Sequence, residues 1–147
     1  MKDIPLRIIS RIDIKGENVI KGIHLEGLRV IGNPNSIASD YYKNGIDEII
    51  FMDVVASLYG RNNLFNVINK AAQNIFIPIT VGGGIRNIQD INKALRNGAD
   101  KVAINTADIK NPNILRDASR IFGSQCIVLS VEAKKRGNNY WEVLTDN

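Results

Sequence analysis

Five apolar, largely β-branched runs recur along the chain, and segments with helical spacing separate them. The runs lie at 7–14, 47–54, 75–81, 101–106 and 126–132. The middle runs are nearly continuous rather than alternating, which is typical of strands covered on both faces. The alternation of strand and helix along the chain predicts an α/β fold with a parallel sheet.

Capping residues mark the ends of the predicted helices. The segments 33–45 and 111–123 each open with an asparagine and a proline and close at a glycine, which predicts a helix in each. A further helix-like segment, 87–98, follows the third apolar run. The stretch 15–34, between the first strand and the first of these helices, is predicted to be a long loop of the kind that often forms a lid.

Two hexapeptides repeat one pattern. "NGIDEI" at 44–49 and "NGADKV" at 97–102 each combine a helix stop, a tight turn and a strand entry. The repeat indicates a duplicated two-unit module, which favours a (βα)8 barrel over an open doubly wound sheet. Such a barrel needs roughly 200 residues or more. The 147 residues therefore predict one domain, 1–147, that is an N-terminal half barrel of roughly four βα units plus a fifth strand, with the C-terminal half absent.

A half barrel of this kind would expose two sheet edges and an unfilled interior, so we expect it to self-associate or to need a complementary half. The net charge of +4 does not indicate nucleic-acid binding, because lysines and arginines are interleaved with acids and aromatic residues are few. A net positive charge is also consistent with binding of an anionic small molecule. Neither a signal peptide nor a membrane span is predicted, and the single cysteine, Cys126, is expected to be a buried apolar residue of a cytoplasmic protein.

The stretch "ITVGGGIRN" places three glycines, Gly82, Gly83 and Gly84, between a strand and a helix. Glycines there let the backbone approach a ligand and point free N–H groups at an anion, so they predict one wall of a phosphate site. Asn105 and Thr106 end the next predicted strand and could add donors from the same edge. The alternative is a flexible turn that binds nothing. The spacing is neither that of a Rossmann fingerprint nor that of a P-loop.

Three acids lie at the carboxyl ends of predicted strands, which is the catalytic end of a barrel: Asp13, Asp53 and Glu132. Two of them facing each other could serve as general acid and base, whereas the alternative for each is a solvated acid at a strand end. We expect Asp13 and Glu132 to be the catalytic pair and Asp53 to belong to the substrate-binding residues. The lone histidine, His24, is interpreted as a solvated or packed residue.

Three charged residues lie at the opposite ends of predicted strands: Arg7, Glu48 and Lys101. They could form a charged ring that closes the bottom of the barrel. An ordinary surface ion-pair cluster is the alternative.

The sequence resembles the cyclase subunit of imidazole glycerol phosphate synthase over essentially its whole length. The resemblance is carried by "RIDIKGENVIKG", "GIDEIIFMDVVAS", "FIPITVGGGIRN", "GADKVAINTA" and "FGSQCIVLSVEAK", in the order and spacing of that family. It implies a (βα)8 barrel of histidine biosynthesis that takes ammonia from a glutaminase partner in a heterodimer. It also implies a bis-phosphorylated ribulosyl-formimino aminoimidazole carboxamide nucleotide as substrate, imidazole glycerol phosphate and aminoimidazole carboxamide ribotide as products, and no metal or organic cofactor.

The resemblance implies roles for individual residues. By position, Asp13 matches the first catalytic aspartate, Lys21 an assisting loop lysine, and Gly84, Asn105 and Thr106 the phosphate site in this half of the barrel. The charged gate through which ammonia enters is matched by Arg7, Glu48 and Lys101, and the face that meets the glutaminase is matched by Asp100.

Two residues depart from the family pattern. Glu132 stands where the family usually has a second catalytic aspartate, and Arg11 stands where it usually has a cysteine, one layer beneath Asp13. A cation there would need acidic partners, for which Asp13 and Glu132 are the obvious candidates. Two alternatives to the cyclase therefore stay open. One is a cyclase-like paralogue that supplies ammonia for amination of sugar nucleotides in surface-polysaccharide synthesis, and the other is a non-catalytic half barrel that binds phosphate.

Overall fold

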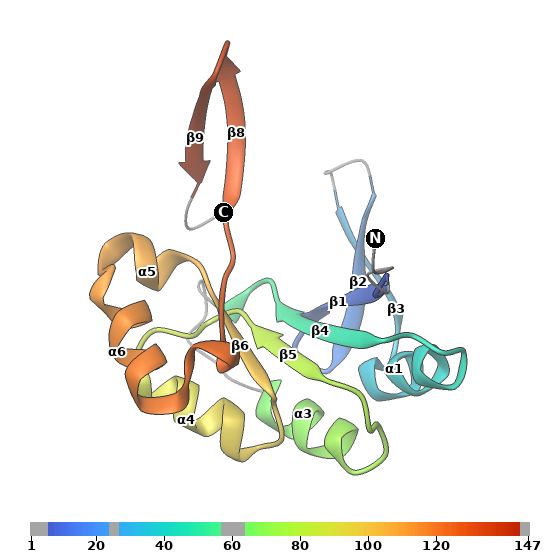
Figure 1. Cartoon of the computed structure of the whole chain (residues 1–147). Helices are drawn as coiled ribbons and strands as arrows, with labels where there is room; N and C mark the ends of the chain where they lie inside the picture. The colour runs from blue at the N-terminus through green and yellow to red at the C-terminus, as the bar shows by residue number, and fades with distance from the viewer. Residues whose placement is uncertain (1–5, 24–26, 57–63, 145–147) are drawn as a thin grey trace, which may run out of the picture.

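A computed structural model describes residues 6–23, 27–56 and 64–144 of the chain. The described residues form a seven-stranded sheet in the order β3-β2-β1-β4-β5-β6-β7, and a separate two-stranded sheet of β8 and β9 (Figure 1). The strands of the large sheet are β1 (Ile9–Lys15), β2 (Asn18–Ile23), β3 (Gly27–Gly32), β4 (Glu48–Asp53), β5 (Ile79–Gly82), β6 (Lys101–Ile104) and β7 (Ile127–Leu129). Those of the small sheet are β8 (Glu132–Gly137) and β9 (Tyr140–Leu144).

Five strands of the large sheet are parallel and follow the chain order: β1, β4, β5, β6 and β7. Helices connect them and cover one face of the sheet, as Figure 1 shows. These helices are α1 (Pro34–Lys43), α3 (Leu64–Ala72), α4 (Ile88–Arg96), α5 (Thr106–Lys110) and α6 (Asn113–Phe122), and a short 3-10 turn, η1 (Ser124–Cys126), precedes β7. This arrangement is an unclosed part of a (βα) barrel, which confirms the predicted fold class.

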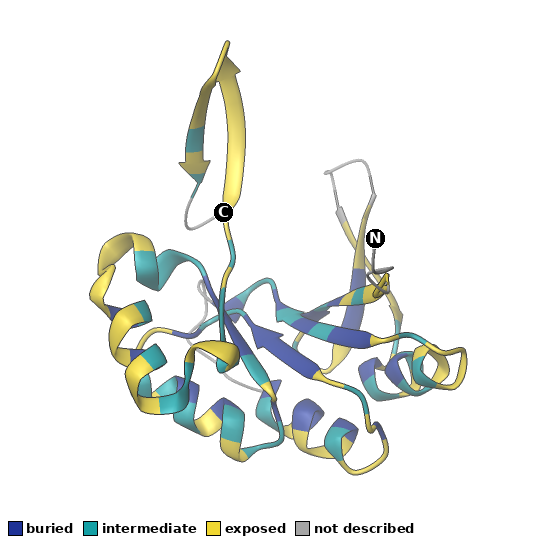
Figure 2. Cartoon of the chain, viewed as in Figure 1, coloured by how far each residue is buried: buried dark blue, intermediate teal, exposed yellow. Residues whose placement is uncertain are grey.

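The core lies between the sheet and its helices (Figure 2). Ile12, Phe51, Val81 and Val102 occupy the middle of four neighbouring strands and are at most 2% exposed. They share one face because parallel strands in register carry their side chains to the same side. The alternate residues of β1, such as Arg11, point to the other face and are exposed, so the sheet buries mainly its helix-facing side.

The predicted helix ends are largely confirmed. Asn33 accepts hydrogen bonds from two backbone N–H groups of α1, at 3.0 and 3.2 Å, and thereby caps that helix. Asn87 caps α4 in the same way, at 2.9 Å. The prediction for 111–123 was less accurate, since α6 begins at Asn113 and Pro112 takes the cap position. A proline without an N–H group fits there because the first turn of a helix leaves its N–H groups unpaired.

The repeated hexapeptides have the same structure. Asn44 and Asn97 end α1 and α4, and the side-chain amide of each donates to the carbonyl four residues earlier, at 2.8 and 2.7 Å. Three residues later, Asp47 and Asp100 each accept a backbone N–H from the start of the neighbouring strand, at 2.7 and 2.8 Å. The repeat therefore joins the turn after each helix to the neighbouring parallel strand that comes earlier in the chain, β1 in one case and β5 in the other.

The prediction of a loop over 15–34 was wrong. The segment forms the antiparallel hairpin β2–β3, and β2 pairs with the end of β1. A turn at Gly16, whose φ of +63° suits glycine, joins β1 to β2. The sequence signal for β2 was weak, because Val19 and Ile20 are adjacent and Lys21 and Gly22 follow them, so apolar and polar residues do not alternate.

Several strand predictions were also too long. β5 begins at Ile79 rather than at 75, because residues 75–78 form the approach to the strand. β7 ends at Leu129, so Glu132 begins the hairpin β8–β9 instead of ending a barrel strand. Cys126 lies in the turn before β7 and is half-buried rather than fully buried. Among the described residues, no helix has the length and apolar character that crossing a bilayer requires.

Candidate functional site

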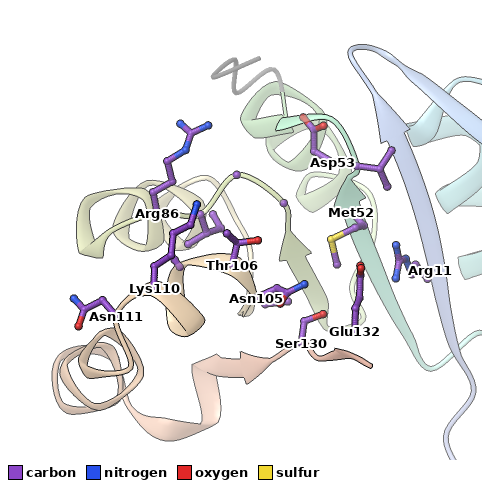
Figure 3. A pocket seen from close by; sticks show the side chains of 16 residues that line it. Arg11, Met52, Asp53, Arg86, Asn105, Thr106, Lys110, Asn111, Ser130 and Glu132 are labelled. Carbon is purple, nitrogen blue, oxygen red and sulfur yellow. The ribbon is translucent and has the colours of Figure 1, made fainter. Parts of the chain in front are cut away.

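A cavity of about 400 Å³ opens at the carboxyl ends of the parallel strands. Its walls come from β1, β4, β6, the loop after β5, the helix α5 and the start of β8 (Figure 3). Parallel strands deliver loops and helix starts to this end, and active sites of barrels lie there. The cavity brings together Gly83, Gly84, Asn105, Thr106 and Glu132, as the sequence predicted.

The three glycines have different roles. Gly83 and Gly84 line the cavity and have φ angles of +92° and +68°, which favour glycine. A Cβ atom at Gly83 would lie 2.1 Å from the carbonyl oxygen of Asp53, so β4 also requires a glycine at this position. Gly82 lies within β5, where a Cβ atom would meet the Met52 side chain at 2.7 Å, and it does not line the cavity.

Asn105 and Thr106 form the wall beside these glycines. β6 ends at Ile104, two residues before the predicted end at 106, so Asn105 follows the strand and Thr106 is the first residue of α5. The side-chain oxygen of Asn105 is buried and has no hydrogen-bond partner among the described residues. Its side chain does not cap α5, and Figure 3 shows it at the cavity. Its amide group can therefore serve a ligand.

The carboxylate of Asp53 is buried at the end of β4 and lines the same cavity. Burial raises the pKa of Asp53, although hydrogen bonds from the backbone N–H groups of Val55 and Ala56 act in the opposite direction. The Val55 bond is 3.0 Å long. Asp53 therefore holds the turn after β4 by these hydrogen bonds while it also lines the cavity.

Asp13 and Arg11 form an ion pair on the open face of β1. The Arg11 Nε donates to the Asp13 Oδ1 at 2.7 Å, which confirms Asp13 as a partner of this cation. Arg11 lines the cavity, whereas Asp13 does not. Glu132 lies in the cavity wall with Arg11, at the start of the exposed hairpin β8–β9. The two predicted catalytic carboxylates therefore come from different sheets at the same end of the fold.

Two basic residues of the cavity were not predicted. Arg86 follows the glycines, and its terminal amino group donates to the carbonyl of Ala56 at 2.8 Å. Lys110 reaches the cavity from α5, and Figure 3 shows it with Arg86 on the side of Thr106 that is away from Arg11. The sequence signal was a cation within four residues of each part of the predicted phosphate site.

The predicted charged cluster forms at the amino ends of the strands. Glu48 is 3% exposed and contacts Lys101 at 2.7 Å, Thr80 at 2.9 Å and Arg7 at 3.5 Å. Burial by itself raises the pKa of Glu48. The hydrogen bonds from Lys101 and Thr80 and the charges of Lys101 and Arg7 outweigh it, so the pKa lies below its ordinary value. The sequence did not indicate the hydrogen bond from Thr80 to Glu48, because a threonine within an apolar strand is common for its β propensity alone.

Lys21 does not lie at the cavity. It is an exposed residue of β2, opposite Arg29 in β3, and so belongs to a hairpin rather than to a loop. His24 lies outside the described residues.

Comparison with known proteins places this geometry in a family. Residues 7–147 match the family described as "Histidine biosynthesis protein". The imidazole glycerol phosphate synthase subunit HisF of Legionella pneumophila is 63% identical over 142 residues, which cover 97% of this chain and 67% of that protein.

More distant relatives carry the same name. The HisF subunit of Methanocaldococcus jannaschii is 47% identical and that of Dictyoglomus thermophilum is 45% identical, each over 93% of this chain. The chain spans 50% and 54% of the lengths of these two relatives. With one family pattern covering residues 7–147 and a relative at 63% identity, the chain belongs to the histidine biosynthesis protein family.

Proposed function

We propose that the chain acts in the cyclase reaction of imidazole glycerol phosphate synthase and supplies the part of the active site that these residues form. The observation that carries the proposal is the identity of 63% to a subunit of that synthase, over 97% of the chain. The relatives described above share this name, so they favour neither the sugar-nucleotide paralogue nor the non-catalytic half barrel.

The cavity supports binding of one phosphate of the substrate. Gly83 and Gly84 offer backbone N–H groups, and Asn105 and Thr106 offer an amide and a hydroxyl group from the wall beside them. Arg86 and Lys110 supply positive charge at the edge of this wall that is away from Arg11 (Figure 3). Charge-assisted hydrogen bonds to an anion are stronger than neutral ones, so a phosphate group is the ligand that these donors suit best.

Acid–base chemistry would come from Asp13 and Glu132. Ammonia condenses with the carbonyl carbon of the bis-phosphorylated substrate, and the carbonyl oxygen leaves as water. The new nitrogen then attacks the formimino carbon, which closes the imidazole ring as the C–N bond to the carboxamide ribotide breaks. Proton transfers in both stages need a positioned acid and base. Glu132 lies in the cavity wall, Asp13 lies behind Arg11, and Lys21 would assist only if the hairpin β2–β3 reaches the bound substrate.

Ammonia would enter, and the glutaminase partner would bind, at the opposite (amino) ends of the strands. Glu48 with Lys101 and Arg7 would form the gate, and Asp100 lies at the same end, where its side chain also holds the start of β5. Phe76 precedes β5 at this end and is 77% exposed. An exposed aromatic residue at the same end of the strands as these charged groups suits the contact with a glutaminase partner.

The test is ammonia-dependent loss of substrate absorbance, measured with the chain alone and with a glutaminase present. We expect Glu132→Gln to reduce turnover at least a hundredfold, as removal of a general acid or base typically does. Glu142→Gln is the matched control, because Glu142 belongs to the same hairpin but pairs with Arg136 outside the cavity. Equal rates in both variants, or a wild-type chain that binds phosphate esters without turnover, would overturn the proposal.

A further inference from the structure

Arg11 stands at the boundary between the cavity and Asp13. The two residues are two positions apart on β1, so their side chains leave the same face of the sheet. Their side chains are 49% and 40% exposed, and their ion pair is 2.7 Å long. Of the pair, Arg11 alone lines the cavity. The geometry therefore presents a guanidinium to the ligand and places the carboxylate behind it.

The ion pair uses only part of the hydrogen-bonding capacity of Arg11. A guanidinium carries five N–H donors in a planar fork. The bond to Asp13 comes from Nε, and the terminal amino groups have no hydrogen-bond partner among the described residues. An anchored Nε restricts rotation of the side chain, so the remaining donors are held in one plane and lose less entropy when they bind an acceptor.

The cavity places these donors on the wall across from the phosphate site. Figure 3 shows Arg11 and Met52 on one side and Asn105, Thr106 and Lys110 on the other. A cavity of about 400 Å³ is within the range that holds small ligands. A ligand with its phosphate on the glycine side therefore extends toward Arg11.

We propose that Arg11 is a substrate-binding residue, in which Asp13 orients the guanidinium and the terminal amino groups bind a second acceptor group of a sugar-phosphate ligand held at Gly83 and Gly84. The inference rests on the proposed function for the class of ligand, and it adds a contact residue to that site. The lining charges agree with it, since Arg11, Arg86 and Lys110 outnumber Asp53 and Glu132.

The test compares a ligand that has one phosphate group with a ligand that has two. The affinity of the whole chain is measured by calorimetry for inorganic phosphate and for ribulose 1,5-bisphosphate. We expect Arg11→Met to weaken binding of the bisphosphate about tenfold, in line with a lost charge-assisted hydrogen bond, and to change the affinity for inorganic phosphate less than about twofold. Arg11→Lys keeps the charge without the fork, and we expect an intermediate loss for the bisphosphate alone.

Arg136 provides a matched control. Its Nε lies 2.6 Å from the carboxylate of Glu142, and the two side chains are 46% and 44% exposed, so the pair resembles Arg11–Asp13 but lies outside the cavity. Arg136→Met should change neither affinity. Three results would overturn the inference. The first is unchanged binding of the bisphosphate in Arg11→Met, and the second is an equal loss of affinity for both ligands, which would indicate a long-range electrostatic effect rather than a contact. The third is an equal effect of Arg11→Met and Arg136→Met.

These readouts separate the inference from the proposed function. A chain that lacks ammonia-dependent turnover but shows the selective loss in Arg11→Met would refute the cyclase proposal and leave Arg11 as a ligand contact. If the wild-type chain shows ammonia-dependent turnover and Arg11→Met binds the bisphosphate as tightly as the wild type, the cyclase proposal stands and the role of Arg11 as a ligand contact is refuted. Absence of binding of both ligands to the wild-type chain would refute both.

Discussion

The Nζ atom of Lys101 lies 2.7 Å from the Oε1 atom of Glu48, although 53 positions separate the two residues in the chain. The side chain of Glu48 is 5% exposed and that of Lys101 is 25% exposed, so the pair is largely removed from water. Thr80 donates to the same oxygen from the strand between them. This contact joins β4, β5 and β6 at their amino ends.

Glu48→Gln is expected to destabilise the chain by about 2–3 kcal/mol. The substitution keeps the shape of the side chain but leaves the half-buried cation of Lys101 without its counter-charge, which is costly away from water. Unfolding in urea measures the change. Glu142→Gln in the exposed pair with Arg136 should cost no more than about 0.5 kcal/mol. Equal losses in the two variants would show that burial does not strengthen the Glu48 contact.

The contribution of Glu48 should depend on pH. Its pKa is lowered in the folded chain from an ordinary value of 4.5, so the unfolded chain takes up the proton first as the pH falls. The stabilisation is therefore complete above pH 4.5 and is lost as the pH falls through the folded pKa. Urea unfolding from about pH 6 to about pH 3 should show the wild type and Glu48→Gln converging. A constant difference would contradict the lowered pKa.

Asp53 should show the opposite dependence. Burial raises its pKa above the ordinary value of 3.8, so the unfolded chain ionises before the folded chain as the pH rises. The wild type then loses stability between pH 3.8 and the folded pKa. Asp53→Asn keeps an oxygen that can accept the Val55 N–H and removes the ionisation. We expect its stability relative to the wild type to increase over this interval, as measured by urea unfolding at each pH.

Gly83→Ala should destabilise the chain by about 3 kcal/mol or more, combining the left-handed φ with a steric clash. Gly16→Ala separates the two effects, because φ is +63° there and nothing lies within 4 Å of the added Cβ atom. Its cost should be about 1–2 kcal/mol. Thermal unfolding measures both variants. Equal costs would mean that β4 moves away from Gly83 and that its close approach is not required.

Phe76→Ala should weaken association with a glutaminase partner about tenfold and leave the stability of the chain nearly unchanged. The ring is 77% exposed and makes an edge contact with Tyr42, at a centroid distance of 6.5 Å. An exposed aromatic residue of this kind can contribute strongly to an interface. Trp141→Ala, on the hairpin at the opposite end of the strands, is the control and should not change the affinity. Association is measured by calorimetry, and an unchanged affinity for Phe76→Ala would remove this residue from the proposed contact.

Local patterns determined much of the fold. Apolar runs located the five parallel strands, asparagine and glycine caps located α1 and α4, and the repeat at 44–49 and 97–102 indicated the barrel topology. These features depend on neighbours within a few residues, so they can be read along the chain. The glycines of the cavity belong to the same class, because the left-handed φ angles of Gly83 and Gly84 are local requirements.

Other features were decided by tertiary structure alone. The sequence does not show that Arg11 lines the cavity and Asp13 does not. Strand parity gives both residues the same face, and neighbouring strands and loops from elsewhere in the chain form the other walls of the cavity. The hairpin β8–β9 displaced Glu132 from the barrel strand, since β7 ends where its pairing with β6 ends. Contacts such as Glu48 with Lys101 depend on which strands become neighbours, and that is a property of the whole sheet rather than of any segment.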